Sequence, residues 1–319
     1  MRERDGLTQA FGLSLSRCTD GRAERLIRTV SDCSETGAAV LNEAFARGYA
    51  CVFSDELGTC SGTCFHDKKL LALNPQRFDA ELAATLVHEA RHAIQSAPEL
   101  SADKNIRSLL VAQRAAEADA TAFECVAAYE MRKKVPEVWN RFRAVHPKIA
   151  AACSKTETPS LGEAFKAWYD DASYVALYDK DVVSFLRTSE NGAGGDFLRR
   201  DVPDGALMNR LCRFAGQSYL NDAAFLSSPR ACCFDEATLA GCRGILRDAA
   251  FLYGRRDDSL NAVFVRSSDG SVGRFSCTGN GEERKTHQSV EAERRRKLDD
   301  DLRDVLPPWV RFKKAKGGR

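Results

Sequence analysis

The feature that most constrains the fold of this chain is the pattern His88-Glu89-Ala90-Arg91-His92. It lies in a run, residues 80–96, that contains neither proline nor glycine, and Asp79 before the run is a suitable N-cap. Apolar residues recur on one side of the run at helical spacing, namely Leu82, Leu86, Ala90, Ala93 and Ile94. The sequence therefore predicts a helix over residues 80–95.

The two histidines of this pattern project from one face of the predicted helix, about one turn apart. That spacing suits two ligands of one tetrahedral zinc ion. Glu89 lies about 100° round the helix from His88, where its carboxylate can reach a water at the metal rather than the metal itself. We therefore expect His88 and His92 as zinc ligands and Glu89 as general base, with an ordinary helix carrying two solvated or ion-paired histidines as the alternative.

A polar stripe runs beside the apolar side of the helix and consists of Glu81, Thr85, His88, His92 and Gln95. Gln95 follows His92 by three residues on this stripe, so three roles stay open for it: orienting a ligand, facing a substrate, or lying in solvent.

A catalytic zinc needs a third protein ligand, which we expect on the next helix, predicted over residues 101–134. Glu117 flanks the apolar stripe of that helix, between two alanines that permit close packing. It is the favoured ligand, with Asp119 second and Glu124 as a further candidate. If Glu117 is the ligand, Asp119 lies about 200° away round the helix and is expected to pair with an arginine or cap an internal donor.

This combination resembles the zincin metallopeptidases, and among them the gluzincin-like group with a glutamate ligand, which includes many bacterial metallopeptidase domains of unknown function. The resemblance is carried by the HExxH residues, by Gln95, by a preceding strand that ends in Leu73-Asn74, and by the segment 117–120. It covers residues 34–190 and implies a zinc held by His88, His92 and a downstream glutamate, with Glu89 as the base. Ala115 stands where many relatives carry that glutamate, so the choice of third ligand stays open.

The pattern of elements predicts an α+β fold: a mostly helical zincin-like domain with a small sheet packed on the HExxH helix, and a smaller C-terminal module. A helix is expected over residues 34–47, and strands over 49–53 and, after a turn at 67–69, over 70–74. The expected division is an N-terminal extension (1–33), the metallopeptidase domain (34–190), a module of helices and short strands (196–280) and a charged basic tail (281–319). The glycine-rich break at 191–195 marks the boundary.

Further elements are expected along the rest of the chain. Helices are expected over 138–152, 161–169, 182–186, 207–220 and 236–253, and short strands over 262–265 and 273–277. The aromatic residues Trp168, Tyr169, Tyr174 and Tyr178 are expected as core or interface anchors rather than as catalytic groups.

Composition limits the class of protein. The 319 residues carry a net charge of +2, are 44% hydrophobic and 29% charged, and show neither a secretory signal nor a membrane-spanning run, so we expect a cytoplasmic globular protein. The twelve cysteines are expected as thiols. Cys60, Cys64 and His66 could offer a structural metal three ligands, but a fourth is missing.

The sequence thus predicts a zinc-dependent hydrolase of peptide bonds that acts on a peptide or protein substrate and has no membrane partner. One alternative is an inactive metal-binding or interaction protein. Another is a nucleic-acid-associated protein that uses the basic tail, although a net charge of only +2 makes a nucleic-acid partner unexpected. The oligomeric state is not predicted.

Overall fold

The computed structural model describes residues 21–95, 106–155, 157–192, 204–235, 263–266, 271–278 and 281–287. Its first part contains α2 (Arg22–Cys33), α3 (Glu35–Ala46), β1 (Ala50–Phe53), the 3-10 turn η1 (Asp55–Leu57), β2 (Gly62–Phe65), β3 (Leu70–Leu73) and α4 (Asp79–Gln95). Six helices follow: α5 (Ile106–Met131), α6 (Pro136–Val145), α7 (Pro147–Cys153), α8 (Leu161–Trp168), α9 (Ala172–Gly192) and α10 (Asp204–Leu211). The last elements are β4 (Arg213–Phe214), β5 (Gln217–Ser218), η2 (Ala223–Ser227), β6 (Cys233–Asp235), β7 (Val263–Arg266), β8 (Val272–Thr278) and β9 (Gly281–His287). The fold is α+β and mostly helical, as predicted.

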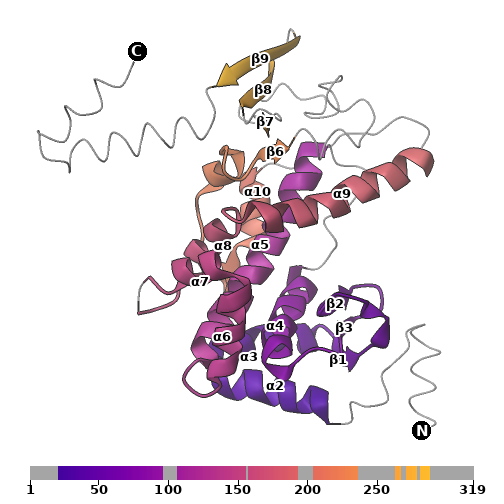
Figure 1. The fold of residues 1–319 in the computed structure, drawn as a ribbon, viewed down its shortest axis with the longest axis vertical. Coiled ribbons are helices and arrows are strands. Elements are labelled where there is room, and N and C mark those ends of the chain that lie inside the picture. Colours follow the sequence, from indigo (N-terminus) through magenta and orange to yellow (C-terminus); the bar gives the residue numbers. More distant parts are fainter. Residues whose placement is uncertain are drawn as a thin grey trace, which may run out of the picture.

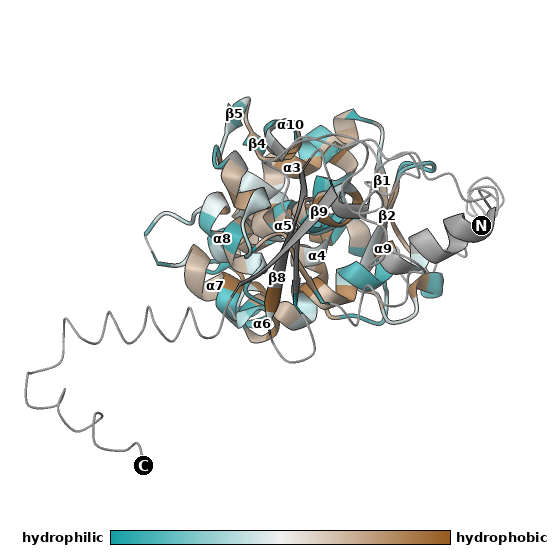
Figure 2. Ribbon diagram, turned by 90° about the horizontal axis from the view of Figure 1, so that it is seen from above, coloured by the Kyte–Doolittle hydropathy of each residue, from teal (hydrophilic) through white to brown (hydrophobic). Residues whose placement is uncertain are grey.

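Helix α5 is the centre of the structure. It contacts α2, α3 and α4 on one side and α6 to α10 on others, so that these helices surround it (Figures 1 and 2). Alanines on several faces of α5 are fully buried, among them Ala112, Ala115, Ala118 and Ala122. Small side chains on several faces let several neighbours approach closely, which explains why one long helix can carry the core.

A small mixed sheet packs against α4, in the order β1-β3-β2. The central strand β3 pairs parallel to β1 and antiparallel to β2, and all four of its residues are buried. This arrangement confirms the predicted sheet on the HExxH helix. The edge strand β2 was not predicted, because its residues Gly-Thr-Cys-Phe lack the apolar alternation that marks a strand.

Helix α3 follows its predicted bounds closely, and α5 ends three residues before the predicted end at residue 134, while its predicted start at residue 101 lies outside the described residues. Ser34 caps α3 by accepting a hydrogen bond from the backbone N–H of Gly37, 2.8 Å away. The single helix expected over 138–152 is instead two, because Pro147 cannot continue the first: α6 ends at Val145 and α7 begins at Pro147.

The prediction of a helix over 207–220 is wrong beyond Leu211, where α10 ends. The chain there turns back as the hairpin β4–β5, whose two turn residues Ala215 and Gly216 have φ angles of 49° and 80°. Two consecutive positive φ angles are the geometry of a tight two-residue hairpin turn.

Part of the chain after the glycine-rich break packs into the same core as α5, as shown by the buried residues Leu207, Leu211, Phe225, Leu226 and Phe234. The break itself falls partly outside the described residues, so the division at 191–195 stays a prediction. The predicted helix 236–253 and the basic tail beyond residue 287 also lie outside the described residues. Among the described helices, none has the length and apolar character needed to cross a membrane.

Candidate metal centre

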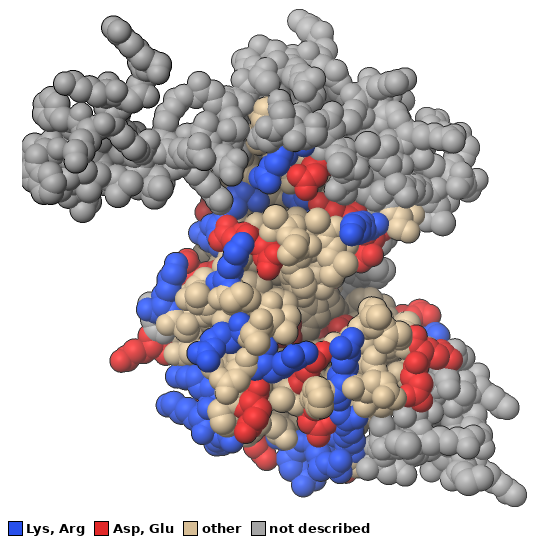
Figure 3. Space-filling view, viewed as in Figure 1, with Lys and Arg blue, Asp and Glu red and all other residues tan. Residues whose placement is uncertain are grey.

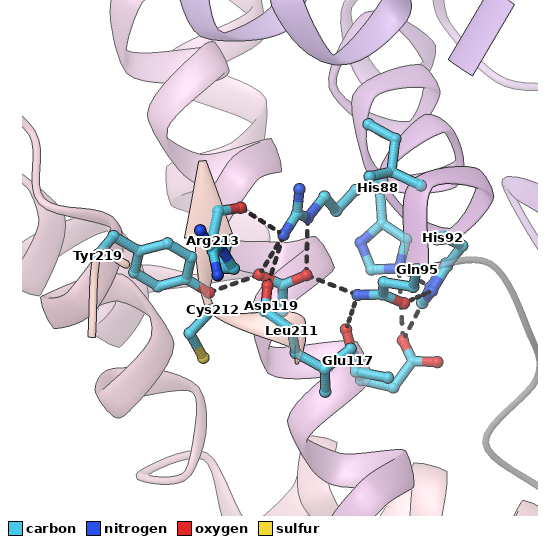
Figure 4. Close-up of polar contacts among 12 residues, drawn as sticks. His88, His92, Gln95, Glu117, Asp119, Leu211, Cys212, Arg213 and Tyr219 are labelled. Carbon is cyan, nitrogen blue, oxygen red and sulfur yellow. Dashed lines mark hydrogen bonds and ion pairs between the residues drawn. The ribbon is translucent and has the colours of Figure 1, made fainter. Parts of the chain in front are cut away.

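The HExxH residues of α4 face α5, which packs along it. His88 and His92 project from α4 at the expected spacing of one turn, and Glu117 projects from α5 towards them (Figure 4). His88 and Glu117 are buried and His92 is nearly so. Two helices, held together by small side chains, thus bring three predicted metal ligands to one point.

The three potential ligand atoms form a compact triangle. The Nε2 atoms of His88 and His92 are 3.0 Å apart. Oε2 of Glu117 lies 3.4 Å from Nε2 of His88 and 3.5 Å from Nε2 of His92. Donors bonded to a tetrahedral zinc ion at about 2.0–2.2 Å lie about 3.3–3.6 Å from one another. The observed triangle matches that size to within a few tenths of an ångström.

Hydrogen bonds on the far side of each ring fix which nitrogen carries the proton. Nδ1 of His88 donates to Oε2 of Glu124, 3.1 Å away, and Nδ1 of His92 donates to Oε1 of Gln95, 2.8 Å away. In a neutral imidazole with its proton on Nδ1, Nε2 presents a lone pair. Both histidines therefore offer a lone pair to the centre of the triangle.

The third corner is also an acceptor. Oε1 of Glu117 accepts a hydrogen bond from Gln113, whereas Oε2 is buried and receives no hydrogen bond of ordinary geometry from any described residue. Three buried acceptors that converge without a donor repel one another unless a cation lies between them. The residues present therefore fit a divalent metal ion.

The charges of the site are strongly coupled in the absence of metal. Burial opposes the charged form of His88, yet the adjacent carboxylates of Glu117, 3.4 Å from Nε2, and Glu124, 3.1 Å from Nδ1, outweigh it and raise the pKa of His88 well above its ordinary value. Burial likewise opposes ionisation of Glu117, but His92 and His88 hold the pKa of Glu117 far below its usual range. Metal binding at such a site releases protons from the imidazoles.

Glu89 lies between α4 and the edge strand β2. Burial raises the pKa of its carboxyl, and the neighbouring imidazoles counter this shift only in part. Gly62 of β2 lies directly against it: a Cβ at position 62 would be 2.9 Å from Cγ and 3.1 Å from Oε1 of Glu89. The carboxylate thus has room only because residue 62 has no side chain.

The other candidates occupy supporting positions. Asp119 is fully buried on another face of α5, where it pairs with Arg91, as expected for the case in which Glu117 faces the histidines. Glu124 contacts the far side of His88 and lies seven residues after Glu117. That spacing returns to the same helix face, so it is the sequence signal that could have identified this role.

The alternative cluster of Cys60, Cys64 and His66 does not form. Within the part of the chain that the structure describes, the only group of three or more His, Cys, Asp or Glu residues whose ligand atoms all lie within 4.8 Å of one another consists of His88, His92 and Glu117. Nδ1 of His66 instead lies 2.9 Å from the hydroxyl of Tyr49.

The triangle opens into a cleft of about 790 Å³. One wall is formed by residues 59–64, which include the first three residues of β2, and the other by α6 and α9. Figure 3 shows the hollow between the part that carries β1–β3 and the part that carries α9. The candidate centre is therefore accessible from outside despite the burial of its ligands.

Comparison with known proteins identifies the family of this chain. No curated protein and no solved structure matches this chain. A family model described as "Putative metallopeptidase family (DUF6782)" matches residues 12–220, a range that contains α2 to α10, the candidate metal centre and the hairpin β4–β5. Because this range is more than half of the chain, the protein belongs to the DUF6782 family of metallopeptidases.

Proposed function

We propose that this protein is a zinc-dependent peptidase in which His88, His92 and Glu117 hold the metal and Glu89 is the general base. The observation that carries the proposal is the convergence of three buried acceptor atoms, 3.0–3.5 Å apart, at the floor of an open cleft. The family match supports a metal-dependent peptidase in general, and the HExxH pattern supports zinc in particular.

Zinc, when bound, supplies Lewis-acid chemistry, since it polarises a carbonyl oxygen and lowers the pKa of water towards about 7. The Glu89 carboxylate accepts the proton of the attacking water and passes it to the leaving amine. Burial supports this role, because it raises the pKa of the Glu89 carboxyl towards neutral pH, which suits a group that must both accept and release a proton. Gly62 leaves the carboxylate the space it needs.

The cleft suits an extended peptide. Among the described strands, β2 pairs with β3 only, so its other edge is free, and Gly62, Thr63 and Cys64 line the cleft. A substrate backbone can add to this edge through main-chain hydrogen bonds. We therefore propose polypeptide rather than small-molecule substrates.

The opposite wall of the cleft is suited to bind apolar side chains of a substrate. Val145 of α6 and Leu177 of α9 line it and are 50% and 52% exposed, which places them among the most exposed large hydrophobic residues of the described chain. Phe142 and Tyr178 extend the same wall. Substrates with a bulky apolar residue near the cleaved bond would cover this surface.

A cytoplasmic location agrees with the cysteines. The nine cysteines whose side chains the structure describes form no disulfide with one another, the state that a reducing compartment maintains.

Digestion of a peptide library tests the proposal. The wild-type chain and Glu89→Gln are purified without chelators, their zinc content is measured, and cleavage products are identified by mass spectrometry. We expect equal zinc in both proteins but a loss of cleavage of several orders of magnitude in the variant, because the base is removed and the ligands remain. Equal cleavage by both proteins, or wild-type protein without metal, would refute the proposal.

A further inference from the structure

Behind His92 lies a buried hydrogen-bond network to which the proposed peptidase mechanism assigns no role. Gln95 contacts Nδ1 of His92 through Oε1 and, through Nε2, contacts the backbone carbonyl of Ala116 at 2.9 Å and Oδ2 of Asp119 at 2.7 Å (Figure 4). All the side chains in this chain of contacts are buried or nearly so.

The partners of Gln95 allow only one orientation of its amide. The carbonyl of Ala116 and the carboxylate of Asp119 are both acceptors, so the NH₂ group must face them. Oε1 is then the atom that meets His92, and an amide oxygen can only accept. The hydrogen bond therefore requires the proton of His92 on Nδ1, which leaves the Nε2 lone pair directed at His88 and Glu117.

Asp119 has two further partners besides Gln95, namely Arg91 and Tyr219. Arg91, the fourth residue of the HExxH pattern, donates to it from Nε at 2.7 Å and from Nη2 at 3.1 Å. The hydroxyl of Tyr219 donates to Oδ1. Because Arg91 is always charged and is buried here, Asp119 is needed as its counter-ion and cannot turn towards the histidines.

The Arg91 clamp, by which we mean Arg91 with its partners Asp119 and Tyr219, depends on the segment after α10. Nη2 of Arg91 also donates to the carbonyls of Leu211 and Arg213, at 2.6 and 3.0 Å. Phe123 of α5 contacts both Arg91 and Tyr219. The Arg91 guanidinium lies 4.0 Å above the Phe123 ring, and the Tyr219 ring packs edge-on against it with the ring centroids 5.9 Å apart. The hairpin β4–β5 and its flanks thus reach the candidate metal centre through Asp119 and Gln95.

We propose that Asp119 and Gln95 are positioning residues that fix the tautomer and ring orientation of His92, and that residues 211–219 are required to hold them in place. The inference rests on the proposed function, since it assigns these residues to a metal ligand. It differs from the expected role of Asp119 as a mere salt-bridge partner, because it makes zinc affinity depend on a carboxylate that does not touch the metal.

The chain contains a matched control. Arg114 and Asp179 form a second buried ion pair of the same kind, with Nε–Oδ1 and Nη2–Oδ2 distances of 2.8 and 2.5 Å. Arg114 also donates to two backbone carbonyls, those of Ala231 and Cys233, and lies 4.3 Å above the ring of Phe234. This pair resembles the Arg91 clamp but makes no contact with the three proposed ligands.

The test measures zinc affinity of the full-length chain by competition with a chromophoric chelator. We expect Gln95→Leu and Asp119→Asn to weaken zinc binding by about 10- to 100-fold. The control Asp179→Asn should remain within about twofold of wild type, because its site is independent of the ligands. Gln95→Leu leaves the Arg91–Asp119 pair intact. If Asp119→Asn does not fold, the zinc affinity of Gln95→Leu alone tests the positioning role.

A second readout is spectroscopic. Long-range ¹H–¹⁵N spectra of the zinc-loaded chain should show a slowly exchanging proton on Nδ1 of His92 in wild type and in Asp179→Asn, because Oε1 of Gln95 accepts it. In Gln95→Leu this proton has lost its acceptor, so its signal should shift and exchange faster with solvent. Wild-type zinc affinity together with an unchanged Nδ1 proton signal in Gln95→Leu would overturn the inference.

His92→Ala separates the two proposals. If this variant loses zinc while Gln95→Leu keeps wild-type affinity, only the positioning role fails. If His92→Ala itself retains zinc, the proposed metal site fails and the inference fails with it.

Discussion

Gly62 offers the sharpest test of how Glu89 is positioned. In Gly62→Ala the new Cβ would lie 2.7 Å from Cγ2 of Thr85 and 2.9 Å from Cγ of Glu89. Carbon atoms pack at about 3.5–4.0 Å, so the Glu89 side chain or strand β2 must move by roughly 0.6–1.1 Å. A displacement of about 1 Å at a catalytic group can cost about 100-fold in rate. We therefore expect kcat of Gly62→Ala to fall by about 10- to 100-fold with zinc content unchanged.

The assay is cleavage of the best library peptide, with zinc measured on the same samples. The double variant Gly62→Ala/Thr85→Ser serves as the control, because serine lacks the methyl group that Cβ meets at 2.7 Å while the contact with Glu89 remains. If the loss arises at Glu89, the double variant stays slow. Full recovery in the double variant, or no loss in Gly62→Ala, would refute the argument.

Three further expectations concern the surroundings of the site. Glu124→Ala should weaken zinc binding by about 10- to 100-fold, measured by chelator competition, because His88 loses the acceptor for its Nδ1 proton. Asp179→Ala should lower the free energy of unfolding by about 3–5 kcal/mol in urea denaturation, because Arg114 is left charged and buried without its partner. Burial lowers the pKa of His146, so the unfolded chain binds its proton first and stability should fall as the pH drops below about 6.5. Urea midpoints across this range should show a flatter profile in His146→Phe, and an equally steep one would contradict the assignment.

The helices of the site could be predicted from local patterns. The bounds of α4 follow from its cap, its apolar side and the absence of helix breakers, and the structure has it at Asp79–Gln95. The preference for Glu117 over Asp119 followed from its place beside the apolar stripe of its helix, between alanines that permit close packing. The structure brings Glu117, and not Asp119, to the two histidines.

The residues that support the ligands could be predicted only in part: an arginine partner was expected for Asp119, but which arginine it is depends on contacts between distant segments. Asp119 meets Arg91 across 28 residues and Tyr219 across 100. The helix expected to extend to Leu220 would have carried Tyr219 away from this position. The contact between Gly62 and Glu89 likewise depends on the pairing of β2 with β3, and no local pattern marked β2 as a strand.

Anomalous diffraction at the zinc edge from crystals of the zinc-loaded chain tests the central claim most directly. We expect a single strong peak within about 2.0–2.2 Å of Nε2 of His88, Nε2 of His92 and Oε2 of Glu117. The same crystals of Glu117→Ala should lose the peak or show it much weakened. A peak bound instead by Asp119, or no peak between the two histidines, would contradict the account.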